Sequence, residues 1–193
     1  MVSLIDDKLI PREASPMVTL RNNLIPQKVG ILVWRIQRKR IAVKEELDKR
    51  GIDLDSLLCP LCNDVVESVD HAIYSCKLAQ EIWVGIYKWW DLPLPSGSNI
   101  EDAIKGGLSI GLNASQRKTW QAIVWVTCYF IWKNRNQKVF RNEAWASPKV
   151  INKIQVKSLE WVKNRSRGRS VDWHQWLLKP NIPRGEHENI DPG

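Results

Sequence analysis

The sequence has no apolar run long enough to cross a membrane. The longest such run, Ala122 to Trp132, covers about 11 residues, whereas a spanning helix needs roughly 20. The first seven residues, Met1-Val2-Ser3-Leu4-Ile5-Asp6-Asp7, are acidic and lack the apolar core of a secretory signal. These absences predict an intracellular protein, nuclear or cytoplasmic, that does not bind membranes.

Motifs for enzymatic chemistry are also absent. The sequence contains no glycine-rich phosphate loop and no nucleophile motif. A polymerase gathers carboxylates around two magnesium ions, but the only Asp-Asp pair, Asp6-Asp7, lies at the extreme N-terminus with no third carboxylate nearby. Glu45-Glu46 and Glu101-Asp102 are interpreted as solvated pairs, and His174 as an isolated histidine. We therefore predict that the chain is not an enzyme.

Acidic residues are in deficit. The 29 Lys and Arg residues exceed the 21 Asp and Glu residues, giving a formal net charge of +8. Residues 24–50 and 149–169 are the most basic stretches, and such charge favours polyanions. We expect RNA or DNA as the partner, bound through its phosphates with low sequence specificity, and the alternative is that these residues are only solvated helix faces. The candidate phosphate-binding residues are Arg35, Arg38, Lys39, Arg40, Lys163, Arg165, Arg167 and Arg169.

Cysteine is scarce, but three of the four cysteines cluster with a histidine. Cys59, Cys62, His71 and Cys76 have the spacing C-x2-C-x8-H-x4-C. Zinc prefers four thiolate or imidazole ligands in a tetrahedron, so this pattern predicts one zinc ion. Four protein ligands leave no position for water, which makes the predicted site structural and not catalytic. The alternative is three buried cysteines and a surface histidine that never meet.

The local geometry of this cluster follows from its spacing. Asn63 comes directly after the second cysteine and tolerates the positive φ that closes such a turn. His71 and Cys76 are five residues apart and cannot face one ion from an unbroken α-helix, so we predict a turn that ends near Tyr74. Cys128 lies on an apolar stripe and is interpreted as a packing residue.

Hydrophobic periodicity is helical almost throughout. The predicted fold is mostly α, with a small zinc-stapled helical lobe followed by a second helical lobe. The stripes are Val29, Leu32, Val33 and Ile36; Leu78, Ile82, Ile86 and Trp90; Trp120, Ile123, Val124, Thr127, Cys128 and Ile131; and Ile151, Ile154 and Leu159. We predict an N-terminal helix and loop at 1–23, the zinc-binding domain at 24–92, a Pro/Gly/Ser linker at 93–113, a helical segment at 114–178 and a disordered tail at 179–193.

Tryptophan is the one abundant aromatic residue, with 11 in the chain. Trp34, Trp83, Trp120 and Trp132 have helical spacing and are predicted to lie in the core. Trp89 and Trp90 are adjacent, so both cannot face one stripe of a helix. We expect one of the two to be exposed, where it would stack on an unpaired base, or to bridge the lobes.

Several segments around the cysteines resemble a known family. They are Leu24-Ile25-Pro26-Gln27-Lys28-Val29, Trp34-Arg35, Leu47-Asp48-Lys49-Arg50-Gly51-Ile52, Val69-Asp70-His71-Ala72 and Ile82-Trp83, with Ile131-Trp132-Lys133-Asn134-Arg135-Asn136 and Trp161-Val162-Lys163-Asn164-Arg165 further on. Together they resemble the reverse-transcriptase zinc-binding domain of plant LINE-type non-LTR retrotransposons, over about residues 2–178. The family has a hydrophobic-Pro-Thr turn between its first two helices, and Ile41-Ala42-Val43 departs from it here.

The resemblance implies a zinc-binding module of a retrotransposon protein whose parent enzyme is an RNA-directed DNA polymerase. In the family a polymerase precedes this domain, and here none does, so we expect either a nucleic-acid-binding module or a decayed fragment with no activity. A further alternative is a structural or protein-interaction module that braces a neighbouring polymerase domain.

Overall fold

The computed structural model describes residues 22–95, 99–106, 111–166, 172–178 and 180. In these ranges the chain forms helices and a single isolated β-bridge between Leu58 and Val66. The elements are α1 (Gln27–Gln37), α2 (Lys44–Asp48), the π-helical turn η1 (His71–Ser75), α3 (Lys77–Trp89), α4 (Ile100–Gly106), α5 (Ala114–Arg141), α6 (Ser147–Arg165) and α7 (Trp173–Leu178). The mostly α prediction is confirmed. None of the helices seen in these ranges has the length and apolarity of a membrane span.

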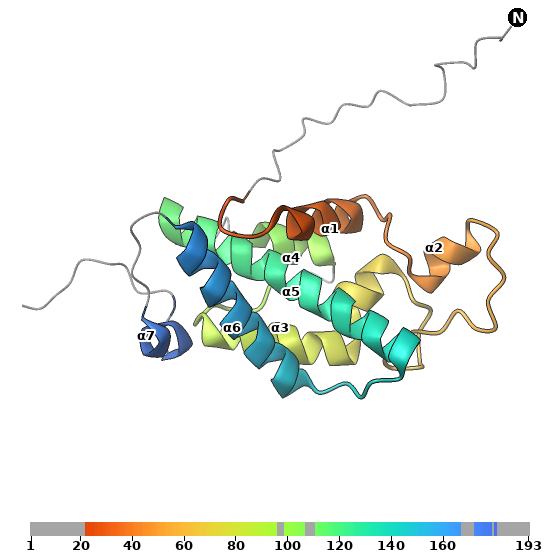
Figure 1. Ribbon diagram of the computed structural model, residues 1–193. Helices are drawn as coiled ribbons and strands as arrows, with labels where there is room; N and C mark the ends of the chain where they lie inside the picture. Colours follow the sequence, from red (N-terminus) through yellow and green to blue (C-terminus); the bar gives the residue numbers. More distant parts are fainter. Residues whose placement is uncertain (1–21, 96–98, 107–110, 167–171, 179, 181–193) are drawn as a thin grey trace, which may run out of the picture.

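Helix α5 is the centre of the molecule (Figure 1). It is 28 residues long, begins with a capping box between Asn113 and Gln116, and ends at Asn142 in the left-handed conformation. The predicted stripe from Trp120 to Ile131 is buried, and so are residues on other sides of the helix, including Trp125 and Phe130. Because α1, α3, α4, α6 and η1 all pack against it, α5 has no wide polar face.

The other predicted stripes also face the interior. They are carried by α1, α3 and α6, where the fully or nearly fully buried members are Val29, Val33, Ile36, Ile82, Ile86, Ile154 and Leu159. Helices α3 and α6 approach closely at Gly85, where a Cβ would lie 2.5 Å from the Cδ1 atom of Ile151. The helical periods in the sequence therefore predicted the packed faces correctly.

The two predicted lobes share one hydrophobic core. The predicted linker at 93–113 contains α4, whose Ile100 and Ala103 are buried against that core. Asn99 caps this helix, because its side-chain oxygen accepts a hydrogen bond of 2.9 Å from the Asp102 amide. At least this part of 93–113 is thus packed structure and not a free spacer. The predicted terminal segments lie almost entirely outside the described residues.

Two of the four tryptophans predicted to lie in the core are fully buried, and two are not. Trp83 and Trp120 are fully buried, whereas Trp34 and Trp132 are half-buried. The expectation of an exposed indole at Trp89 or Trp90 is wrong. Trp90 is buried, and the half-buried Trp89 donates its indole N–H to two main-chain carbonyls of α7, each at 3.0 Å. The bridging alternative for Trp89 is therefore correct.

Candidate metal centre

A short hairpin presents the first two cysteines. The amide of Cys59 donates to the carbonyl of Val65 at 2.7 Å, and the amide of Asn63 donates to the carbonyl of Cys59 at 2.8 Å. Asn63 adopts the predicted positive φ, at 54°. Asparagine accepts this conformation more readily than most residues, so the turn closes without a glycine. Both cysteine thiols consequently project from one side of the turn, toward His71 and Cys76.

The other two ligands lie at the two ends of η1. The amide of Cys76 donates to the carbonyl of His71 at 2.9 Å, which is the i→i+5 bond of a π-helical turn. Cys76 itself is extended, with φ −59° and ψ 133°, and α3 starts after it. The turn ends at Ser75, directly after Tyr74, so the predicted break near Tyr74 is confirmed. This wide turn brings His71 and Cys76, which are five residues apart, to the same site.

The four side chains converge on one point. Their ligand atoms all lie within 4.8 Å of one another. Cys59 Sγ is 3.9 Å from Cys76 Sγ, and Cys62 Sγ is 3.3 Å from His71 Nε2. A zinc tetrahedron with Zn–S bonds of about 2.3 Å has S–S edges of about 3.8 Å, so these separations fit zinc. They do not fit a disulfide, whose sulfurs lie about 2.05 Å apart.

The electrostatics of the site also suit a cation. Cys59, His71 and Cys76 are buried, and Cys62 is half-buried. The pKa of the Cys59 thiol is raised by the hydrogen bond between Cys59 and Cys76 and by the burial of Cys59. The same hydrogen bond lowers the pKa of Cys76. Burial lowers the pKa of His71, which favours the neutral imidazole that binds metals. Three cysteine sulfurs this close can all be thiolates only with a cation between them, so metal binding and loss of the thiol protons are coupled at this site.

Comparison with known proteins agrees with this chemistry. Residues 10–83 match the family model described as zinc-binding in reverse transcriptase. This segment is a reverse-transcriptase zinc-binding domain. All four ligands lie inside the match, and one structural zinc is the cofactor that they fit. No curated protein and no solved structure matches the chain.

The zinc-binding domain replaces the expected Pro-Thr turn with a cap from elsewhere. Val43 precedes α2 and provides no side-chain cap. Instead, the Glu67 carboxylate accepts the amide of Lys44 at 3.0 Å, and the Glu67 carbonyl accepts the amide of Glu45 at 3.2 Å. An N-terminal helix end favours such a negative charge. The departure at Ile41-Ala42-Val43 therefore leaves the helix break intact, because the metal-binding hairpin supplies the cap.

Glu67 also forms a buried ion pair with Arg135 of α5. Arg135 Nε donates to Glu67 Oε1 at 2.7 Å, and its Nη2 donates to Oε2. Glu67 is 0% exposed and Arg135 3% exposed, and the guanidinium lies 5.0 Å from the centre of the Trp132 ring. Sequence reasoning missed this pair. Arg135 lay in a recognised motif, but nothing local to Glu67 signalled a partner 68 residues away.

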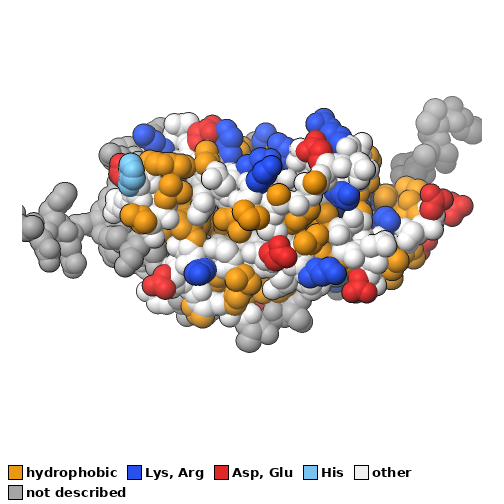
Figure 2. All heavy atoms as spheres, turned by 90° about the horizontal axis from the view of Figure 1, so that it is seen from below, with side chains coloured by type: hydrophobic (Ala, Val, Ile, Leu, Met, Phe, Trp, Pro, Cys, Tyr) orange, Lys and Arg blue, Asp and Glu red, His pale blue; other side chains and the backbone are white. Residues whose placement is uncertain are grey.

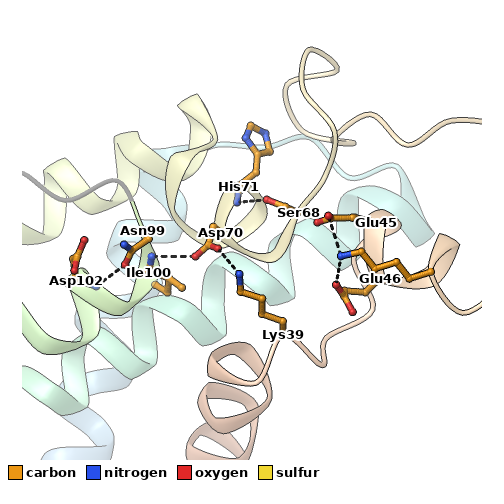
Figure 3. A network of polar contacts seen from close by, with 10 residues as sticks. Lys39, Glu45, Glu46, Ser68, Asp70, His71, Asn99, Ile100 and Asp102 are labelled. Carbon is orange, nitrogen blue, oxygen red and sulfur yellow. Dashed lines mark hydrogen bonds and ion pairs between the residues drawn. The ribbon is translucent and has the colours of Figure 1, made fainter.

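Residues next to His71 link η1 to α4 and to the turn that follows α1 (Figure 3). The His71 amide donates to Ser68 Oγ at 3.1 Å. Asp70 accepts the amide of Ile100 in α4 at 3.4 Å and pairs with Lys39, after α1, at 3.5 Å. The metal-binding turn is thus anchored from both sides by polar contacts.

The predicted phosphate-binding residues form two separate groups. Arg35, Arg38, Lys39 and Arg40 are exposed at the end of α1, and Lys163 and Arg165 are exposed at the end of α6. Figure 1 shows these helix ends apart, with α1 ending toward α2 and α6 ending toward the start of α5. Arg167 and Arg169 lie outside the described residues. The structure therefore does not bring the two groups into one cluster.

Proposed function

We propose that this zinc-stapled helical unit is a non-catalytic module of a LINE-type retrotransposon protein that binds RNA or DNA through phosphates. The observation that carries the proposal is the distribution of charge over the helices. Helix α1 has two basic residues and no acidic one, α5 has six and none, and α6 has five and one. We call the exposed Lys and Arg residues of these three helices the basic face.

Acidic residues gather elsewhere. Helix α2 carries three of them against one basic residue, and α4 begins with Glu101 and Asp102. The single acidic residue of α6, Glu160, is paired with Lys157 at 2.6 Å. In Figure 2, basic side chains lie along the upper edge of the view with acidic ones among them, and others lie in its middle and lower part. A face with so little negative charge attracts a polyanion at long range, and each phosphate contact releases counterions.

The zinc contributes structure in this proposal. When bound, the ion neutralises the clustered thiolates and holds the hairpin closed, and four protein ligands leave it no position for a substrate. The hairpin then places Glu67 beneath Arg135, which ties the metal centre to α5. The family description refers to reverse transcriptases, whose substrates are nucleic acids, and this supports the choice of partner.

The test is electrostatic. We would titrate the zinc-loaded chain against labelled RNA, single-stranded DNA and duplex DNA at several salt concentrations. For roughly four to eight phosphate contacts, log affinity should fall with log salt at a slope of about −3 to −7. All sequences should bind about equally, because phosphate contacts carry no base information.

Two matched double variants distinguish the effect of charges on the basic face from the effect of net charge on nucleic-acid binding. Lys163→Glu with Arg165→Glu reverses two charges at the end of α6, and Lys77→Glu with Lys88→Glu reverses two exposed charges on α3. Both change the net charge equally, but only the first should flatten the slope, by about 0.7 to 0.9 per lost contact. An absence of binding at low salt would favour the bracing role beside a polymerase domain instead.

A further inference from the structure

The basic face contains a partly exposed cluster of aromatic rings. Tyr129 of α5 and Trp161 of α6 are half-buried, with ring centres 6.2 Å apart and planes inclined by 68°. Phe130 lies beneath them, nearly parallel to Trp161 at 6.5 Å. Two cations cover the cluster, since Lys28 Nζ lies 5.8 Å from the Tyr129 ring and Lys133 Nζ lies 6.0 Å from the Phe130 ring.

This arrangement differs from the aromatic packing of the core. Trp83, Tyr87, Trp90 and Trp120 contact one another and are at most 1% exposed. Tyr129 instead has the ammonium group of an exposed lysine against its ring. The side chain of a surface lysine is readily displaced, because its long stem is flexible and its charge is well solvated. The ring of Tyr129 is therefore accessible to another flat, apolar group.

We propose that Tyr129 and Trp161 bind an unpaired nucleobase, while Lys28 and Lys133 bind the phosphates on either side of it. A base would take the ring position that Lys28 covers, and the ammonium would move to a phosphate. Stacking of a base on an aromatic ring is favourable for every base, and the added cations strengthen it. The inference rests on the proposed function and narrows it to single strands, since bases in a duplex are already stacked.

Neighbouring charges continue the site in both directions. Lys157 and Arg165 are four residues before and after Trp161, so they share its side of α6. Arg35 is seven residues after Lys28 and shares its side of α1. A strand with one base on Tyr129 thus has basic residues of α1 and α6 near its backbone on both sides. Such a combination of stacking ring and positive track is typical of single-strand binding.

The test uses the zinc-loaded full chain and a short single-stranded DNA with one 2-aminopurine, with the matching duplex as the control ligand. Tyr129→Leu should weaken single-strand binding by about 5- to 150-fold and leave duplex binding unchanged. The salt slope should stay the same, because no charge is removed. Stacking should quench 2-aminopurine fluorescence with the wild type and with Tyr129→Phe, but not with Tyr129→Leu.

Two outcomes would overturn the inference in distinguishable ways. If wild-type binding depends on salt but Tyr129→Leu affects single strands and duplex alike, or affects neither, the phosphate-binding function stands and the stacking site is wrong. If the wild type binds no nucleic acid at any salt concentration, both are wrong. Zinc content and circular dichroism check that Tyr129→Leu is folded. If it is not, Trp161→Leu replaces it in the same assays: loss of the quenching seen with the wild type supports the stacking site, and unchanged quenching overturns it.

Discussion

Replacing Arg135 by methionine tests the buried ion pair between the zinc hairpin and α5. Methionine keeps most of the length and apolar volume of the arginine stem but removes its charge. Glu67 would then be 0% exposed with no cation beside it, and with only amide donors such as that of Lys44 as partners. Leaving one member of a buried pair without its partner costs about 3–5 kcal/mol. That is a large fraction of the roughly 5–15 kcal/mol that stabilises a typical domain.

The same helix offers a matched control. Arg141 also pairs with a glutamate, Glu143, but at 3.8 Å and with side chains 72% and 47% exposed. Surface pairs of this kind contribute less than about 1 kcal/mol, so Arg141→Met should change stability little. Urea denaturation of the zinc-saturated proteins would measure both changes, provided that the m-values stay equal.

A double-mutant cycle then isolates the pair. Glu67→Gln keeps an oxygen for the Lys44 amide but removes the charge, so the double variant Glu67→Gln with Arg135→Met should be more stable than the sum of the single effects predicts. Equal losses in Arg135→Met and Arg141→Met would refute the reasoning. So would strictly additive effects in the cycle, because they would show that the two side chains contribute independently.

Three further predictions concern the metal ligands, the turn after Cys62 and the expected lack of polymerase activity. Cys59→Ser should lose the zinc and lower the helical content, whereas Cys128→Ser should keep one zinc per chain by elemental analysis, because Cys128 lies in the middle of α5 and is not one of the four ligands. Asn63→Gly should leave stability nearly unchanged, whereas Asn63→Val should lower the thermal midpoint by the equivalent of about 1–2 kcal/mol, since a β-branched residue resists the φ of 54°. The isolated chain should extend no primer with Mg²⁺ or Mn²⁺, and metal-dependent extension in a template assay would contradict the non-enzymatic interpretation.

The sequence predicted those features that depend on residues close together in the chain. The ligand spacing identified all four metal ligands, because a hairpin and one turn suffice to bring them together. Helical stripes identified the buried faces of α1, α3, α5 and α6, since those faces repeat with the helical period. The positive φ at Asn63 was likewise predictable from one residue and its place after Cys62.

Contacts between distant segments were not predictable in this way. From the sequence alone Glu67 would be interpreted as a surface acid, because its partner Arg135 lies in α5, 68 residues away. The sequence left open whether Trp89 or Trp90 would be exposed or bridge the lobes, because the carbonyls that accept the indole N–H of Trp89 lie in α7, 87 and 88 residues away. Helix α4 lies in a stretch whose prolines and glycines suggested a linker, and only the burial of Ile100 and Ala103 reveals its place in the core. In each case a tertiary partner outweighs the local composition.

The same long-range contacts change what loss of zinc would mean. Two separate lobes would allow the second to stay folded while the first unfolds. Here Glu67 belongs to the metal-binding hairpin and forms a buried ion pair with Arg135. Arg135 belongs to α5, the helix on which α1, α3 and α6 all pack. Zinc binding to structural sites is worth roughly 10–16 kcal/mol, and that free energy is coupled to everything that folds with the site. Because one core spans both parts, zinc binding should stabilise α5 as well as the hairpin, and the proposed nucleic-acid-binding surface on α5 should depend on an ion bound by residues outside that helix.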